Sequence, residues 1–344
     1  MADLALPKRL LHWYAILVAA SILVLICSGG LVTSRGAGMA VPDWPNSFGY
    51  NMFLFPVSHW VGGVLFEHTH RLIASGVGLL TIGLCGLTAV LEDRIWVKWL
   101  GGIALLAVII QGLLGGLRVT EHNQLLGLFH GCLGQLYFCI VSTIALVTSA
   151  FWRSIEPGQS RLRRLRFWTL AVTAMVFVQL VLGALMRHSH TGLSIPDFPA
   201  AYGRIFPPLD EASVARINDY RATKEAAPPI TAGLILLQYV HRIWAVFIVA
   251  LIGSVGIAIL RERALRFQVR FAGTLWIFLV LTQFGLGAWT IWSNKAADVA
   301  TAHVFFGALT LMTGVLLTVI LSASVVSSTR KQAAAASQKE VAKA

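Results

Sequence analysis

The sequence Glu67-His68-Thr69-His70-Arg71 opens a long apolar run, and a related sequence, Gln238-Tyr239-Val240-His241-Arg242, opens another. Ionisable side chains at the mouth of a membrane helix are costly to keep, so such a cluster predicts a functional site. The two histidine–arginine pairs are 171 positions apart (241 − 70). This spacing indicates two similar halves, and the apolar runs around the two sequences predict the fold.

The chain is strongly apolar: 57% of its 344 residues are hydrophobic and only 12% are charged, whereas soluble domains have about 25% charged residues. Eight apolar runs reach the roughly 20 residues that a membrane helix needs. Alternating, barrel-like segments are absent, so we expect helices. We therefore predict an all-α polytopic membrane protein. The runs are 13–33, 62–91, 96–117, 124–150, 167–187, 231–260, 271–292 and 299–326.

The net charge of +12 could suggest nucleic-acid binding, but its distribution argues against that function. Basic residues gather at both termini and in every second connection, which is one side of the membrane if eight helices alternate. This positive-inside pattern predicts cytoplasmic termini, and the basic loops should contact anionic lipid. No transit peptide precedes the first run, which favours a bacterial plasma membrane. The basic residues are Lys8, Arg9, Arg94, Lys98, Arg153, Arg161, Arg163, Arg164, Arg166, Arg261, Arg263, Arg266, Arg270, Arg330, Lys331, Lys339 and Lys343.

Other motifs recur at nearly the same spacing, which indicates a duplication of four helices. Pro42-Asp43-Trp44-Pro45 and Pro196-Asp197-Phe198-Pro199 are 154 positions apart (196 − 42). Gln111 and Gln283 are 172 apart (283 − 111). The rise from 154 to 171 predicts an insertion at about 204–229, which we interpret as a partly ordered cap or lid. Because four is even, the copies should form two parallel-repeated four-helix bundles.

The duplication divides the chain into four parts. Residues 1–152 form the N-terminal half, 153–166 a basic linker, 167–326 the C-terminal half, and 327–344 a cytoplasmic tail.

One histidine lies on the second and one on the fourth helix of each half. The pairs are His70 with His130 and His241 with His303, and 173 positions separate the later members (303 − 130). Each should lie about 10–17 Å from the outer end of its helix. Two imidazoles at similar depth are typical of the axial ligands of a haem iron. Zinc fits less well, because it needs three or four nearby ligands.

Three further residues are candidates for the same sites. Arg71 and Arg242 follow the histidines, and they could reach the outer interface or pair with haem propionates, which we favour because guanidinium binds carboxylates bidentately. Glu67 corresponds to Gln238 (238 − 171 = 67), and only the carboxylate can exchange protons at neutral pH. This asymmetry favours a reactive N-terminal site with Glu67 as catalytic residue. A structural glutamate near the interface is the alternative.

The remaining histidines and the cysteines carry weaker signals. His68 should point to another helix face than His70, and His12 should lie at the cytoplasmic interface. The other histidines lie in or beside outer loops and are expected to be solvated; they are His59, His122, His188 and His190. All cysteines lie within apolar runs and are expected to be buried thiols; they are Cys27, Cys85, Cys132 and Cys139.

Over about residues 10–325 these features together resemble the haem A synthase family of cytochrome oxidase haem biosynthesis. The resemblance implies oxidation of the C8 methyl group of haem O to a formyl group, in two steps through a hydroxymethyl intermediate, with water as the oxygen source. It implies a haem b cofactor on His241 and His303, and haem O on His70 and His130. Glu67 matches an essential carboxylate of the family.

The resemblance also implies partners, and it has one departure. In some members partner proteins hand over haem O, above all the farnesyltransferase that forms it. Some members carry an outer-loop cysteine pair that this chain lacks, so any mechanism that needs the pair cannot operate here. Electrons must then pass to an acceptor that no motif identifies.

Two other classes of protein are compatible with four matched histidines. One is a di-haem b-type electron-transfer protein, and the other is a transporter or haem-handling scaffold without substrate chemistry. The first does not explain why only one half keeps a carboxylate at the position of Glu67, and the second would bind haem without redox-dependent conversion.

Overall fold

The structure of the chain is a computed structural model that describes residues 5–156, 160–225 and 227–341, with the backbone alone at residues 160 and 326–341. Within these ranges, eight helices are long and apolar enough to cross a membrane, which confirms the predicted all-α membrane fold. They are α1 (Leu6–Ser34), α2 (Gly62–Leu91), α3 (Ile95–Thr120), α4 (Gln124–Val147), α6 (Arg163–His188), α8 (Ala232–Arg261), α9 (Phe267–Trp292) and α10 (Ala297–Val341).

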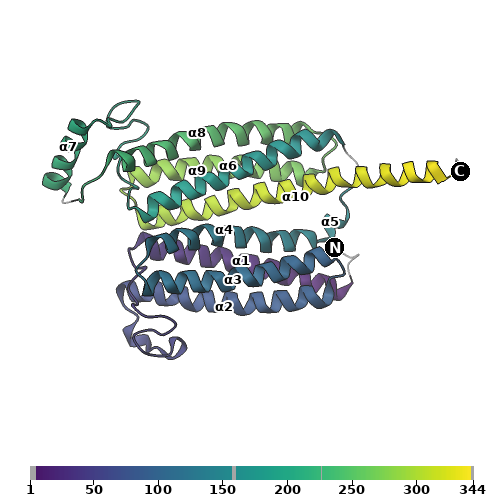
Figure 1. The fold of residues 1–344 in the computed structure, drawn as a ribbon, viewed down its shortest axis with the longest axis horizontal. Helices are drawn as coiled ribbons and strands as arrows, with labels where there is room; N and C mark the ends of the chain where they lie inside the picture. Colours follow the sequence, from purple (N-terminus) through teal and green to yellow (C-terminus); the bar gives the residue numbers. More distant parts are fainter. Residues whose placement is uncertain (1–4, 157–159, 226, 342–344) are drawn as a thin grey trace.

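The long helices lie side by side in two groups, α1–α4 and α6 with α8–α10 (Figure 1). Both chain ends lie at one end of the assembly, which we call the terminal end; it includes the connections 92–94, 148–162 and 262–266. The opposite end, the loop end, includes the connections 35–61, 121–123, 189–231 and 293–296. Short elements are η1 (Met52–Leu54), η2 (Val57–His59), α5 (Ala150–Arg153), η3 (Ser160–Leu162), α7 (Glu211–Tyr220) and the π-helical η4 (Arg221–Glu225).

The two groups meet through α1 and α4 on one side and α6 and α10 on the other. Their apolar cores interlock at this junction. Cys139 of α4 is 4% exposed and packs within the core of the second group, whose members include Ile252 and Trp276. Ala308 of α10 is 1% exposed and packs within the core of the first group, beside residues such as Tyr137. Each group therefore completes the core of the other.

Two predicted segments take a more definite form in the structure. The segment 327–341, predicted as part of a cytoplasmic tail, continues α10 as a helix, in agreement with the high helix propensity of its alanine-rich sequence; the last part of the predicted tail, 342–344, lies outside the described residues. The insertion contains α7 and η4, and Val214 and Ile217 of α7 pack on a small core with Ile195 and Ile235. It lies beyond the end of α8 (Figure 1).

The expectation of buried thiols holds fully for one cysteine and partly for the other three. Cys139 is buried, the other three are half-buried, and all four are free.

Candidate functional site

All four predicted ligand histidines lie at the loop end, within about the first three turns of their helices. His70 follows the start of α2 by eight residues (70 − 62), His130 follows that of α4 by six (130 − 124), His241 follows that of α8 by nine (241 − 232), and His303 follows that of α10 by six (303 − 297). At 1.5 Å per residue, this is about 9–14 Å along each helix. The matched depth follows from the matched starts of the helices.

Each histidine ring lies against a glycine of a neighbouring helix. A Cβ added at that glycine would lie only 3.0–3.2 Å from Cε1 of the imidazole, so glycine lets the ring approach the helix backbone. The pairs are Gly29 with His70, Gly115 with His130, Gly183 with His241, and Gly287 with His303. The glycines repeat at the spacings of the duplication, 154 (183 − 29) and 172 (287 − 115). In both halves, therefore, two imidazoles pack against glycines at equivalent positions, and we call each such glycine the seat of its histidine.

The hydrogen bonds of the rings suit a metal-binding role. His70 interacts electrostatically with His130, and His241 with His303, so each pair lies together. Nδ1 of His130 and of His303 lies 3.1 Å from the backbone carbonyl of Gln111 and Gln283, respectively. A metal-bound histidine commonly donates its second ring N–H to such a carbonyl, which orients Nε2 towards the metal.

The halves differ in the glutamines near these rings. Nε2 of Gln179 lies 3.2 Å from Nε2 of His241, and Nε2 of Gln283 lies 3.3 Å from Nε2 of His303. Leu25 occupies the position of Gln179 in the first half (179 − 154 = 25). In one respect the halves agree: Nδ1 of His70 and Nδ1 of His241 are both buried without a hydrogen-bond partner among the described residues.

These observations fit a haem better than a small-ion site. The described residues include no group of three or more His, Cys, Asp or Glu side chains that could hold a metal ion. A haem iron needs only two axial protein ligands, because the porphyrin supplies the others. Two seated imidazoles per half meet that need.

Glu67 and Arg71 hold the loop 41–49 at the loop end, and we call this arrangement the first clamp. The backbone N–H of Val41 donates to Oε2 of Glu67, and Nη2 of Arg71 donates to Oε1, both at 2.9 Å. The two Nη atoms of Arg71 also donate to the carbonyl oxygens of Val41, Asp43 and Asn46. Only 5% of the Glu67 side chain and 9% of the Arg71 side chain are exposed. Both charges therefore lie within the turn that they hold.

Gln238 and Arg242 form an equivalent second clamp on the loop 195–203. The backbone N–H of Ile195 donates to Oε1 of Gln238 at 2.6 Å. Arg242 donates to the carbonyl oxygens of Ile195, Asp197 and Ala200, which match the acceptors of Arg71. Inside each loop the aspartate accepts two backbone N–H groups, and each loop has a cis X–Pro bond.

The clamps bear on three sequence predictions. Both carboxylate oxygens of Glu67 accept hydrogen bonds from the protein, so the residue has a place in the loop structure beside any catalytic role. The terminal nitrogens of Arg71 and Arg242 donate to loop carbonyls. Propionate binding by these arginines and base catalysis by Glu67 remain predictions.

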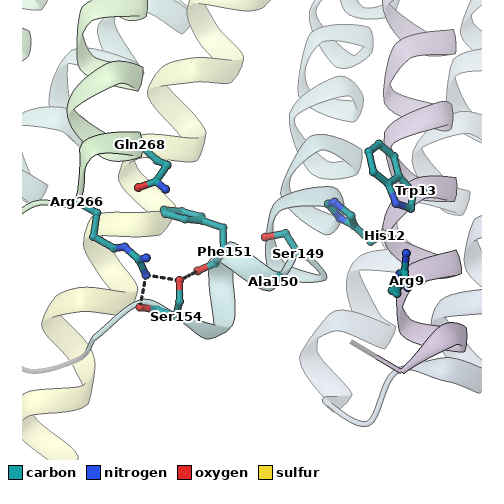
Figure 2. A pocket seen from close by; sticks show the side chains of 9 residues that line it. All are labelled: Arg9, His12, Trp13, Ser149, Ala150, Phe151, Ser154, Arg266 and Gln268. Atoms are coloured by element: carbon teal, nitrogen blue, oxygen red, sulfur yellow. Dashed lines mark hydrogen bonds between the residues drawn. The ribbon is translucent and has the colours of Figure 1, made fainter. Parts of the chain in front are cut away.

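The other histidines are not part of the paired rings, but His188, which was expected to be solvated, is half-buried against α4 and interacts electrostatically with His130. His68 is fully buried, with Nδ1 3.1 Å from the Ser47 hydroxyl and its ring against Trp60. His59 is exposed. His12 lies at the terminal end in a pocket of about 430 Å³, together with Arg9 and Arg266 (Figure 2). That pocket is at the opposite end of the assembly from the histidine pairs.

Two arginines near the pairs were not singled out from the sequence. Arg118 in the last turn of α3 acts electrostatically on His70 and His130, and Arg187 near the end of α6 acts on His303. Their counterparts in the repeat are Thr290 (118 + 172) and Thr33 (187 − 154), so the duplication gave no signal for them. The glycines beside the histidine rings did carry a sequence signal, since Gly115 and Gly287 lie within repeated motifs.

We expect Gly116→Ala to lower the melting temperature of the purified chain. An added Cβ would overlap the Trp44 ring of the first clamp loop, and such overpacking costs about 1–3 kcal/mol. The matched control is Gly112→Ala in the same helix, where an added Cβ meets nothing within 4 Å. Equal melting temperatures for the two variants would contradict the tight fit.

Comparisons with known proteins agree with this arrangement. The family described as cytochrome oxidase assembly protein (COX15-CtaA) matches residues 12–315. A protein of Geobacillus kaustophilus named heme A synthase is 24% identical over 87% of this chain and 87% of its own length. Proteins of the same name from Lysinibacillus sphaericus and Exiguobacterium sibiricum are 28% identical over 57% of this chain and 64% of theirs, and 25% identical over 87% and 91%. Since the family match spans nearly all eight helices, the chain belongs to the haem A synthase family.

Proposed function

We propose that this chain is a haem A synthase, an oxidoreductase that converts the C8 methyl group of haem O to a formyl group. The observation that carries the proposal is the pair of glycine-seated histidines in each half. Family membership and the relatives named heme A synthase support it. Haem O is the substrate on His70 and His130, and haem b is the cofactor on His241 and His303.

The chemistry proceeds in two oxidations that balance separately. The methyl group and one water give a hydroxymethyl group, two electrons and two protons. The hydroxymethyl group then gives the aldehyde, again with loss of two electrons and two protons. Haem b, when bound, would pass the four electrons one at a time to an external electron acceptor. The formyl oxygen thus derives from water.

The protein groups position the substrate and accept protons. His70 and His130 hold the substrate iron, and the carbonyl of Gln111 orients His130 through Nδ1. Glu67 accepts a proton from the methyl group or from the attacking water. The glutamine at the equivalent position, Gln238, supports this assignment because it cannot accept a proton at neutral pH.

We place the loop end outside the cell and the terminal end in the cytoplasm of a bacterium. The termini and the basic connections share the terminal end, in agreement with the positive-inside rule. Both haem sites then lie towards the outer face of the plasma membrane. The farnesyltransferase that forms haem O is the proposed source of the substrate.

The test is haem analysis of membranes from bacteria that make haem O but lack their own haem A synthase. Expression of this chain should convert haem O to haem A, with some hydroxymethyl intermediate, as identified by mass after extraction. The empty vector should leave haem O alone. Normal amounts of the chain with unchanged haem O would refute the activity.

The equivalence of the two histidine seats favours one alternative, a di-haem electron carrier. A carrier would yield two equivalent b haems and neither haem O nor haem A from the purified protein. The same extraction therefore separates the two functions.

A further inference from the structure

Four basic side chains from both halves meet at the loop end, and we call them the junction cluster. They are Arg118 at the end of α3, Arg187 and His188 at the end of α6, and Lys295 between α9 and α10. Arg118 acts electrostatically on Arg187 and His188, and Arg187 acts on Lys295. A Cβ added at Gly127 of α4 would lie 2.6 Å from Cε1 of His188 and 3.1 Å from Cδ of Arg118. Both side chains therefore lie against the same part of α4.

The junction cluster has no carboxylate of its own among the described residues. None of its members forms an ion pair there. Arg118 donates no hydrogen bond, and its Nε is buried without a partner. Arg187 donates to two neutral oxygens, the carbonyl of Gly30 at 2.5 Å and the Ser34 hydroxyl at 3.0 Å. Glu67 acts on Arg118, but its carboxylate is already paired with Arg71.

Basic side chains that lie close together without a carboxylate disfavour one another's cationic forms. Burial and the nearby charge of Arg187 lower the pKa of Lys295 below its ordinary value. Partly buried charges are normally paired, because desolvation without compensation is costly. Like charges gathered without an acid therefore point to an anionic ligand.

The junction cluster adjoins the histidine pairs of both halves. Arg118 acts on His70 and His130, and Arg187 acts on His303. Guanidinium groups bind carboxylates bidentately, and the propionate side chains of a haem are carboxylates. Arg71 and Arg242 also act on histidines, but their terminal nitrogens already donate to loop carbonyls.

We propose that the junction cluster binds haem carboxylates, with Arg118 serving the substrate haem and Arg187 serving haem b. This inference rests on the proposed function, because it needs a haem in each half. It assigns propionate recognition to residues at the contact between the halves, in place of Arg71 and Arg242.

The test compares iron protoporphyrin IX with its dimethyl ester, which lacks the carboxylate charges. The full chain carrying His70→Ala, which leaves only the C-terminal pair intact, is produced under haem limitation, purified and titrated with each porphyrin by absorbance. We expect the acid to bind at least about tenfold more tightly than the ester. Adding Arg187→Leu should weaken binding of the acid about tenfold and change binding of the ester by less than about twofold.

Two further variants sharpen the comparison. Arg187→Lys keeps a charge but not the bidentate geometry, so it should restore part of the preference for the acid. Arg35→Leu is the matched control, because Arg35 is an exposed arginine at the loop end that lies over the Phe66 ring. The Arg35→Leu variant should keep the full preference for the acid over the ester.

Each other outcome has a distinct meaning. If Arg187→Leu weakens binding of the acid and of the ester equally, or weakens the binding of neither, haem carboxylates are not the ligand. Loss of co-purified anionic phospholipid in that variant would then identify a lipid phosphate as the anion. If the parent chain binds haem without preference for the acid, only the junction-cluster proposal fails. If it binds no haem at all, the proposed function fails as well.

Discussion

Replacing His303 by alanine should remove the b-type absorbance spectrum of the purified chain. The ring of His303 packs against Gly287, and Nδ1 lies 3.1 Å from the Gln283 carbonyl, so Nε2, which lies 3.3 Å from Nε2 of Gln283, is the proposed iron ligand. Alanine provides no iron ligand at this position. We therefore expect the protein to lose the haem, and not only to show a changed redox potential of the haem. His241→Ala should have the same effect.

The control for these variants is His59→Ala, because His59 is exposed in η2. Its spectrum should equal that of the wild type. The measurement is the reduced-minus-oxidised spectrum at equal protein concentration, with haem quantified after extraction. An unchanged spectrum in His303→Ala would show that the ligand assignment is wrong.

Glu67→Gln should leave the fold and haem content near normal while lowering the yield of haem A by about two orders of magnitude or more, which is the usual contribution of a general base. The second clamp provides the structural reason. There a glutamine, Gln238, accepts the loop N–H beside Arg242, so an amide at position 67 can hold the loop in the same way. Proton exchange and the charge opposite Arg71 are then lost, while the acceptor for the Val41 N–H is kept, as in the second clamp, where Arg242 donates to the loop beside an uncharged glutamine.

The comparison variant is Glu67→Ala, which removes the carboxylate beside Arg71, as Glu67→Gln does, and also leaves the Val41 N–H without its acceptor. A buried donor left without a partner costs about 1–3 kcal/mol, so this variant should be less thermally stable than Glu67→Gln. The measurements are melting temperature and haem A yield in the same membranes. A normal haem A yield from Glu67→Gln would confine Glu67 to the clamp.

The helices and the duplication could be predicted because each depends on information local to the sequence. Apolar length predicts a span, and the spacings of His70 with His241 and of His130 with His303 reveal the repeat. Equal depth of the histidines then follows from equivalent helix starts. The depths observed, six to nine residues, are close to those expected from the apolar runs.

The partners of the charged residues could not be predicted in the same way. Arg71 and Arg242 follow the predicted ligand histidines in the sequence, but the direction of their side chains depends on loops that fold back over α2 and α8. The cis turns that place those carbonyls leave no distinctive pattern beyond two prolines. Arg118 and Arg187 matter because α3 and α6 end at the same junction, which is a property of packing between the halves.

The interlocked cores at that junction also bear on how the protein could have evolved. An alanine of α10 completes the interior of the first copy and a cysteine of α4 completes that of the second. If the two halves arose by duplication, they have since adapted to each other at this junction. An exchange of one half between relatives would then also need matching residues on the other half.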